Sequence, residues 1–230
     1  RVLDKLSLQF SPGKNYCLLG KNGSWKSSLA LTVMWHPSYQ VMGWEIVCDG
    51  VSLQEMWPHE RAKAWIFLAF QTIPEIKWVK LFEFLRTIYN SAHGTSETIV
   101  SFKKLILPYL DELHIDKDFL WRDLNVWFSG GERGKIEILQ LNLLRPKYIF
   151  LDEVDSGLDV DAFKAVAQLL QWVNTGENCL ILITHYFTIL SYIAVDHVYV
   201  LDQWVLVAEW DQSLAAQIQE RGFEERRIEK

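Results

Sequence analysis

The residues most able to bind an anion stand at positions 20–28, directly after the apolar run 16–19. There Lys26 is followed at once by the hydroxyls of Ser27 and Ser28. In a phosphate-binding loop of the pattern G-x-x-x-x-G-K-[ST], backbone N–H groups surround the phosphates, the lysine reaches the β- and γ-phosphates, and the next hydroxyl binds Mg²⁺. Trp25 replaces the second required glycine, and a Cβ costs about 1–2 kcal/mol wherever the backbone needs φ > 0. By itself, the segment fits a simple strand–turn–helix junction equally well.

Two adjacent carboxylates, Asp152 and Glu153, end the apolar run 148–151. Open α/β sheets bind their ligands at the carboxyl ends of their strands. We therefore expect Asp152 to bind Mg²⁺ and Glu153 to polarise an attacking water as a general base. The alternative is that the two carboxylates merely cap the strand. The phosphate-loop pattern upstream favours the catalytic interpretation.

Further polar groups stand at the ends of other apolar runs. Gln71 follows the run 65–70 and His185 follows the run 180–184, so both are expected at the same edge of the sheet. A lone His at a strand end is usually a surface residue, but its place beside a carboxylate pair favours contact with a γ-phosphate. A second helix N-terminus, rich in free N–H groups, is expected at Ser129, Gly130, Gly131 and Glu132.

Short apolar runs predict strands, and amphipathic patterns between them predict helices. The expected strands are 16–19, 44–47, 65–70, 147–151, 179–184 and 197–201. The expected helices are 26–33, 81–90, 102–113, 131–143, 160–174 and 187–193. The runs 148–151 and 180–183 are apolar throughout, which is typical of parallel strands buried on both faces. This order predicts an α/β fold with a mostly parallel sheet, interrupted at 81–126 by helical patterns without strands.

Composition narrows the function classes. A formal charge of −6 argues against a nucleic-acid partner, because backbone phosphates require a basic surface. No apolar run approaches the roughly 18 residues that cross a bilayer, so no direct membrane insertion is expected. Cys17, Cys48 and Cys179 form no CxxC pair and are interpreted as small hydrophobes in strands. With no signal peptide, they favour a cytoplasmic location, or the plastid stroma if a transit peptide has been removed.

The order of these motifs resembles the nucleotide-binding domain of ABC-type ATPases. Within that family the chain is most similar to the SufC-type ATPases of the Suf iron–sulfur cluster assembly machinery, in segments within 69–76, 125–140, 151–159 and 184–201. The resemblance implies a P-loop NTPase fold with a catalytic α/β core at 1–80 and 127–230, which includes a partly antiparallel β part. A helical insertion is expected at 81–126, adjoined by a signature helix at 128–143.

The resemblance also implies ATP and Mg²⁺ as ligands and a role for each motif residue. The residues expected at the nucleotide are Gly20, Asn22, Gly23, Ser24, Trp25, Lys26, Ser27 and Ser28. The expected metal-binding residues are Ser27, Gln71 and Asp152, and the expected catalytic residues are Gln71, Glu153 and His185. In a transient head-to-tail homodimer, residues 129–132 of one copy would reach the ATP of the other, beside Asp159 of the D-loop. Such dimerisation would remodel SufB/SufD-type scaffold proteins.

Tryptophan is the main departure from this pattern. The chain has 11 Trp against 12 Gly, whereas a chain of this length ordinarily carries about 16 Gly. The tryptophans that stand where SufC-type relatives have glycine are Trp25, Trp35, Trp44, Trp65, Trp78, Trp127, Trp204 and Trp210. This indicates either a divergent or recoded chain, or a sequence that departs from the natural functional protein. Two further functions stay open: a nucleotide-impaired member that only binds the scaffold, and the ATP-binding subunit of a membrane transporter.

Overall fold

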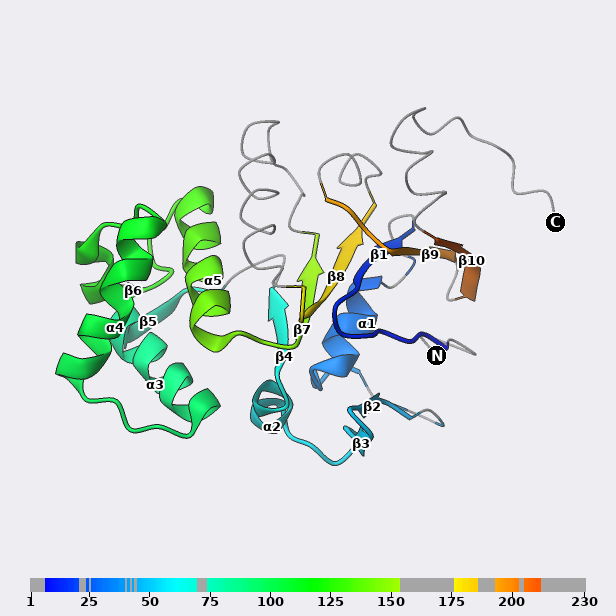
Figure 1. Ribbon diagram of the computed structural model, residues 1–230, viewed down its shortest axis with the longest axis horizontal. Coiled ribbons are helices and arrows are strands. Elements are labelled where there is room, and N and C mark those ends of the chain that lie inside the picture. The colour runs from blue at the N-terminus through cyan, green and yellow to red at the C-terminus, as the bar shows by residue number, and fades with distance from the viewer. Residues whose placement is uncertain are drawn as a thin grey trace.

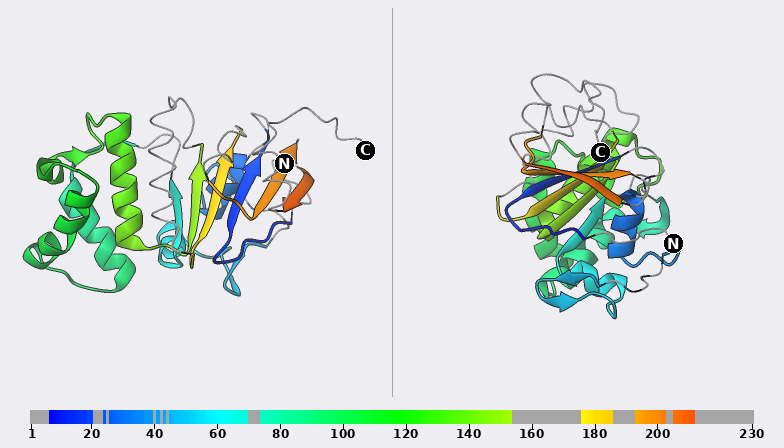
Figure 2. Two further views of the ribbon diagram at one scale, coloured as in Figure 1. Left: turned by 45° about the horizontal axis from the view of Figure 1, so that its top comes forward. Right: turned by 90° about the vertical axis from the view of Figure 1, so that its right-hand side faces the viewer.

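Six strands form the central sheet of the protein (Figure 1). The computed structural model describes residues 7–20, 24, 26–39, 41, 43, 45–69, 74–153, 176–185, 193–202 and 205–211. In sheet order the strands are β10 (Val205–Asp211), β9 (His197–Asp202), β1 (Asn15–Leu19), β8 (Cys179–Thr184), β7 (Tyr148–Asp152) and β4 (Ile66–Ala69). Only the β9–β10 pair is antiparallel. The carboxyl ends of the five parallel strands therefore lie along one edge (Figure 2).

The parallel strands are buried on both faces, as their continuous apolar runs predict. All six residues of β8 are buried. Leu180 and Leu182 join one core cluster, whereas Ile181 and Ile183 join a second, because successive side chains of a strand point to opposite faces. Cys17, Cys48 and Cys179 lie in strands and form no disulfide, as expected.

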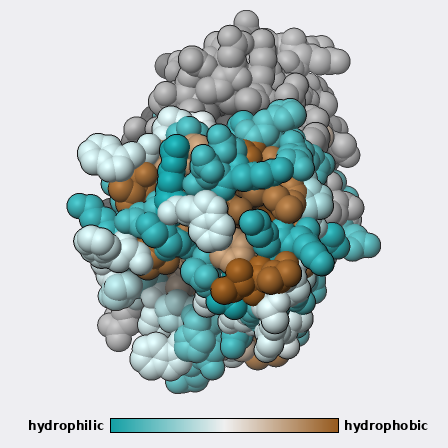
Figure 3. All heavy atoms as spheres, turned by 90° about the vertical axis from the view of Figure 1, so that its left-hand side faces the viewer, coloured by the Kyte–Doolittle hydropathy of each residue, from teal (hydrophilic) through white to brown (hydrophobic). Residues whose placement is uncertain are grey.

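Helices pack against this sheet and also form a group beside one end of it (Figure 1). Helix α1 (Lys26–Val33) contributes Ala30 and Val33 to the second core cluster. Helices α3 (Leu81–His93), α4 (Ile99–Glu112) and α5 (Gly130–Leu144) gather beside the β4 end of the sheet (Figures 1 and 2). Their inward side chains join the first cluster. Figure 3 faces this end and shows hydrophobic side chains scattered among hydrophilic ones.

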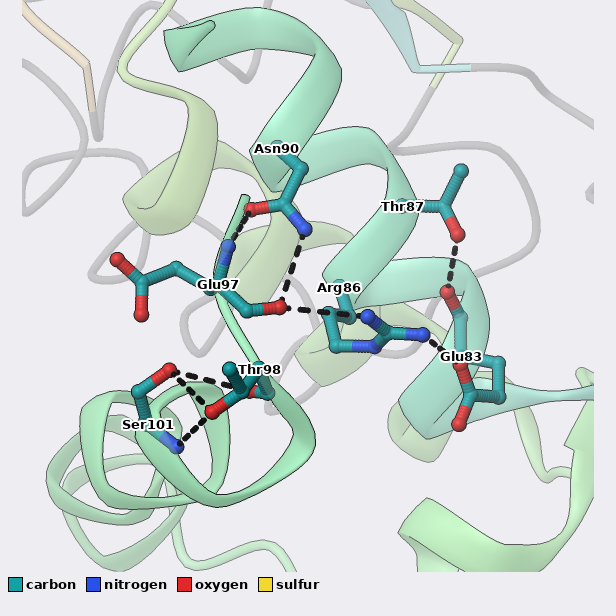
Figure 4. A network of polar contacts seen from close by, with 7 residues as sticks. All are labelled: Glu83, Arg86, Thr87, Asn90, Glu97, Thr98 and Ser101. Atoms are coloured by element: carbon teal, nitrogen blue, oxygen red, sulfur yellow. Dashed lines mark hydrogen bonds and ion pairs between the residues drawn. The ribbon is translucent and has the colours of Figure 1, made fainter. Parts of the chain in front are cut away.

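A polar network ties α3 to the start of α4 (Figure 4). Asn90 Oδ1 accepts from the Glu97 N–H at 2.8 Å, and Arg86 donates to the Glu97 carbonyl at 3.3 Å. Arg86 also pairs with Glu83 at 2.7 Å. Thr98 caps α4 by accepting from the Ser101 N–H at 3.2 Å. This cap starts α4 at Ile99, earlier than the predicted 102, because the capped turn satisfies N–H groups that lack helical partners.

Two predictions about strands are wrong. The predicted strand 44–47 is a strand only at Val47 among its described residues, because a turn at Asp49 and Gly50 pairs β2 (Val47–Cys48) with β3 (Val51–Ser52). The stretch 81–126 contains a strand, β6 (Asp123–Leu124), which pairs with β5 (Ile76–Lys80). Every residue of β5 is exposed, so the sequence carries no burial pattern for this hairpin.

The remaining elements are short or lie outside the described residues. Helix α2 (Pro58–Lys63), the 3₁₀ helix η1 (Lys117–Trp121) and the edge strand β10 were not predicted. The predicted helix 160–174, and all of the predicted helix 187–193 except Ile193, fall outside the residues that the structure describes.

Candidate functional site

Lys26 is the first residue of α1, just beyond the carboxyl end of β1. Its side chain is buried, and Nζ donates to the Gly20 carbonyl at 2.8 Å and to Ser24 Oγ at 3.3 Å. Gly20 admits no side chain, because a Cβ would overlap Ser24 Oγ and the Leu201 carbonyl oxygen. Burial lowers the pKa of the Lys26 ammonium, and the two carboxylates after β7 oppose this effect. A buried ammonium at a helix N-terminus is a combination suited to binding an anion.

Ser27 and Asp152 meet across the same edge of the sheet. Ser27 Oγ donates to Asp152 Oδ1 at 2.8 Å. Asp152 is 6% exposed; burial raises the pKa of its carboxyl, and its bond from Ser27 works in the opposite direction. A hydroxyl and a carboxylate fit Mg²⁺, which takes few protein ligands and completes its shell with phosphate oxygens and water. Within the described part of the chain, no three His, Cys, Asp or Glu side chains form a metal-binding cluster by themselves.

Glu153 and His185 lie side by side at the ends of adjacent strands. The Glu153 N–H donates to the Ile183 carbonyl at 2.9 Å, which extends the β7–β8 pairing past the end of β7. Glu153 has a φ of 48°, in the left-handed region that a non-glycine residue seldom adopts. Its Oε1 lies 3.7 Å from His185 Nδ1, and both side chains are largely buried. Parallel register thus brings a general-base candidate and an imidazole to one point, as predicted for adjacent strand ends.

The turn at residues 129–132 begins α5 with a capping box. Ser129 Oγ accepts from the Glu132 N–H at 3.3 Å, and Glu132 Oε2 accepts from the Ser129 N–H at 2.7 Å. Hydrogen bonding from the Ser129 backbone N–H, and secondarily from the Ser129 side chain, lowers the pKa of the Glu132 carboxyl. Gly130 and Gly131 are exposed, and nothing within 4 Å would meet a Cβ at either. The turn is therefore an open helix N-terminus, and α5 begins on the side toward which the parallel strands point (Figures 1 and 2).

Comparison with known proteins assigns the family. Residues 3–156 match the ABC transporter family. The chain belongs to this family of ATPases. SufC of Escherichia coli, a probable ATP-dependent transporter, is 38% identical over 226 residues, which cover 96% of this chain and 91% of that protein. The probable ATP-dependent transporter slr0075 of Synechocystis is 39% identical over 228 residues, 97% of this chain and 89% of that protein.

Solved structures of ABC cassettes share the fold. A dimeric ATP-binding cassette, MJ0796, bound to ADP and phosphate superimposes with a TM-score of 0.76 at 18% identity, covering 92% of this chain and 90% of that one. An ATP-binding subunit of an ABC transporter gives 0.76 at 22% identity, covering 96% and 89%. The predicted P-loop NTPase fold of the ABC type and the predicted resemblance to SufC-type ATPases are both confirmed. No helix in the described ranges combines the length and the apolar character needed to cross a bilayer.

The structure places most of the predicted residues of this ABC ATPase and adds one. Asn22, Gly23, Trp25, Gln71 and Asp159 lie outside the described residues. The described ones are Gly20, Ser24, Lys26, Ser27, Ser28, Ser129, Gly130, Gly131, Glu132, Asp152, Glu153 and His185. Ser28 is buried, and its Oγ donates to Tyr39 Oη at 3.0 Å. No sequence pattern indicated Tyr39, because it follows a turn after α1 and belongs to none of the motifs.

Proposed function

We propose that this chain binds and hydrolyses ATP as a subunit of a SufBCD-type iron–sulfur cluster assembly complex. The observation that carries the proposal is the Ser27–Asp152 hydrogen bond, which closes the start of α1 onto the end of β7 beside Lys26. The ammonium and the helix N-terminus suit phosphates, and the hydroxyl and the carboxylate suit Mg²⁺. The 38% identity to SufC supports the assignment to the Suf branch of the family.

Nucleotide binding would change the partners of Lys26. Its Nζ would leave the Gly20 carbonyl and contact the β- and γ-phosphates, while Ser27, Asp152 and Gln71 would hold Mg²⁺. Bound Mg²⁺ supplies neutralising charge for the phosphates. The rest of the phosphate loop would donate backbone N–H groups from Gly20, Asn22, Gly23, Ser24, Trp25 and Ser28.

Glu153 and His185 would act on the γ-phosphate side of the nucleotide. Glu153 would orient the attacking water and accept its proton, with Gln71 beside the water or the metal. His185 would donate a hydrogen bond to the γ-phosphate. Their 3.7 Å separation, between Oε1 and Nδ1, supports a shared position next to the transferred group.

A second copy of the chain would complete the site. The turn at 129–132 places an exposed helix N-terminus on the surface, and the positive end of the helix dipole favours an anion. In a transient head-to-tail dimer this turn would bind the ATP of the partner, next to Asp159, and closure would remodel a SufB/SufD-type scaffold. The core at 1–80 and 127–230 would carry the nucleotide, and the 81–126 insertion would move with the signature helix 128–143. We place this assembly in the cytoplasm or the plastid stroma, the latter because of a chloroplastic relative from Arabidopsis thaliana at 35% identity.

A membrane-transporter subunit is the second candidate, favoured by the word transporter in the names of several relatives. A nucleotide-impaired scaffold partner is the third, and its basis is Trp25 in the phosphate loop. The three differ in what accompanies the chain and in whether it turns over ATP. Purification from the source organism distinguishes the first two by a SufB/SufD-like scaffold or a polytopic membrane protein.

The direct test of catalysis is phosphate release from Mg-ATP by the chain and by Glu153→Gln. We expect turnover to disappear in Glu153→Gln while ATP binding persists, because the amide cannot accept the proton. Glu112→Gln, on the exposed end of α4, is the matched control and should turn over like the parent. Normal turnover by Glu153→Gln would refute the role of Glu153 as a base.

A further inference from the structure

Tryptophans occupy left-handed backbone positions in this chain. Seven of its tryptophans lie among the described residues, and four of them have positive φ: Trp35 (59°), Trp65 (63°), Trp78 (69°) and Trp127 (62°). Glycine is the residue that adopts this conformation freely, whereas for a bulky side chain it is a genuine outlier. All four belong to the set of tryptophans for which the resemblance to SufC-type ATPases implies glycine.

The other described tryptophans behave differently. Trp57 has a φ of −66°, and Trp121 closes the 3₁₀ helix η1. Neither stands at a glycine position of the SufC pattern. Trp210 does, but it lies in β10 and has no positive φ. At six of the seven described tryptophans, a positive φ therefore occurs where the SufC pattern has glycine and is absent where it does not. Trp210 is the exception.

Trp35 occupies the position at which helices most often end in glycine. The His36 N–H bonds to the Leu31 carbonyl at 2.8 Å, and the Trp35 N–H bonds to the Thr32 carbonyl at 3.0 Å. These two bonds define a Schellman motif with Trp35 at its left-handed residue. Trp65 occupies the left-handed position after α2, where its N–H bonds to the Ala62 carbonyl at 3.1 Å, and its φ equals the 63° of Gly94, the glycine that ends α3.

Packing does not account for the indoles at the other two positions. Trp78 is 91% exposed and Trp127 is 90% exposed. A side chain left almost wholly in water stabilises little by burial, so nothing offsets the unfavourable backbone conformation. Such a position accepts glycine and gains nothing from tryptophan.

We propose that the polypeptide made in the source organism carries glycine at these four positions, because their codon is UGA read as glycine. UGG specifies tryptophan in the known codes, whereas organisms with variant codes read UGA either as tryptophan or as glycine. A gene that uses UGA for glycine gives this pattern when UGA is translated as tryptophan: indoles at glycine positions, and true tryptophans left in place. The same assignment extends to the remaining glycine positions of the pattern, Trp25, Trp44, Trp204 and Trp210.

Reading Trp25 as glycine has a direct consequence for the proposed ATP-binding function. Glycine at position 25 completes the G-x-x-x-x-G-K-S pattern from Gly20 to Ser27, which removes the only departure in that loop. This consequence rests on the proposed ATPase function. The assignment at Trp35, Trp65, Trp78 and Trp127 rests on backbone conformation and does not depend on that function.

The gene sequence and the native protein test the proposal directly. We expect UGA at the eight glycine positions and UGG at Trp57, Trp121 and Trp172, and peptide mass spectrometry of the protein from its own cells should find glycine at position 78. UGG codons at Trp35, Trp65, Trp78 and Trp127, or tryptophan in the native peptides, would overturn it. If a chain with glycine in place of tryptophan at all eight of these positions binds no ATP, the proposed function is refuted and the codon assignment is unaffected.

A stability comparison tests the structural basis. Trp78→Gly and Trp127→Gly should each melt about 1.5–3 °C above the matching Trp→Ala variant, because alanine retains the Cβ that a positive φ disfavours and glycine's larger unfolded-state entropy offsets only part of that difference. At Trp121, inside a helical turn, the order should reverse, with alanine above glycine. Alanine variants at 78 and 127 that equal or exceed the glycine variants would overturn the claim that these positions are built for glycine.

Discussion

Glu153, the proposed general base, has an unfavourable backbone conformation. Its φ of 48° lies in the left-handed region, which costs a non-glycine residue about 1–2 kcal/mol. Glycine removes that cost but adds roughly 0.5–1 kcal/mol of chain entropy in the unfolded state. Taking the middle of each range, Glu153→Gly should be more stable than Glu153→Ala by about 0.75 kcal/mol, which is about 1.5–3 °C in Tm for a chain of this size.

The alanine variant isolates the backbone effect. Both substitutions remove the carboxylate and its contact with His185, so the difference between them reports the φ angle and not the loss of charge. The free energy of unfolding is measured by urea titration at pH 7, with Tm from calorimetry. Glu112, the last residue of α4, provides the reference: Glu112→Gly should be about 1 kcal/mol less stable than Glu112→Ala.

Activity and stability should separate in these variants. Both Glu153 substitutions are expected to abolish ATP turnover, although the glycine variant unfolds at higher temperature than the alanine variant. Equal stability of the two, or a more stable alanine variant, would refute the left-handed assignment. Retained turnover in either would refute the role of Glu153 as a general base.

Two further predictions concern buried charges. Arg61 is 1% exposed and donates to the carbonyl oxygens of Thr32, Val33, Leu53 and Met56. Arg61→Met should therefore lower the free energy of unfolding, measured by urea titration, by about 3–5 kcal/mol, because it leaves these buried carbonyls without donors. The control Arg122→Met replaces an exposed arginine and should change the free energy of unfolding by less than about 1 kcal/mol. A loss near that of the control would contradict the buried role. Burial raises the pKa of Asp152, so the folded chain holds that proton more tightly than the unfolded chain, and stability falls as the pH rises from 3.8 through the folded pKa. Asp152→Asn should therefore be more stable than the parent at pH 7 and similar below about pH 4; a less stable variant at pH 7 would contradict the direction of the shift.

The sheet and the polar residues along its carboxyl edge could be predicted because they follow from short-range patterns. Continuous apolar runs predicted β7 and β8. The polar residues at the ends of these strands, Asp152, Glu153 and His185, were therefore expected at one edge of the sheet. Ser27 and Asp152, 125 residues apart in the sequence, were both expected at Mg²⁺, and the structure joins them by a hydrogen bond at the carboxyl edge of the sheet. The site therefore depended on topology more than on any one motif.

The exposed hairpin and the backbone angles could not be predicted in this way. The β5–β6 hairpin exposes all of β5, so no alternation distinguishes it from a loop. Helix α2 is only six residues long, although Pro58 at its first turn and the capping Glu60 were usable signals. Glu153 combines a positive φ with a hydrogen bond to the Ile183 carbonyl of the neighbouring strand, a long-range contact that no local pattern contains.

Calorimetric titration of Mg-ATP into the chain with Trp25→Gly tests the central claim most directly. We expect saturable binding at one site per chain, followed by hydrolysis. Adding Lys26→Met should abolish binding, because the ammonium at the start of α1 would no longer contact the phosphates. A folded Trp25→Gly chain that gives no binding heat and no phosphate release would contradict it.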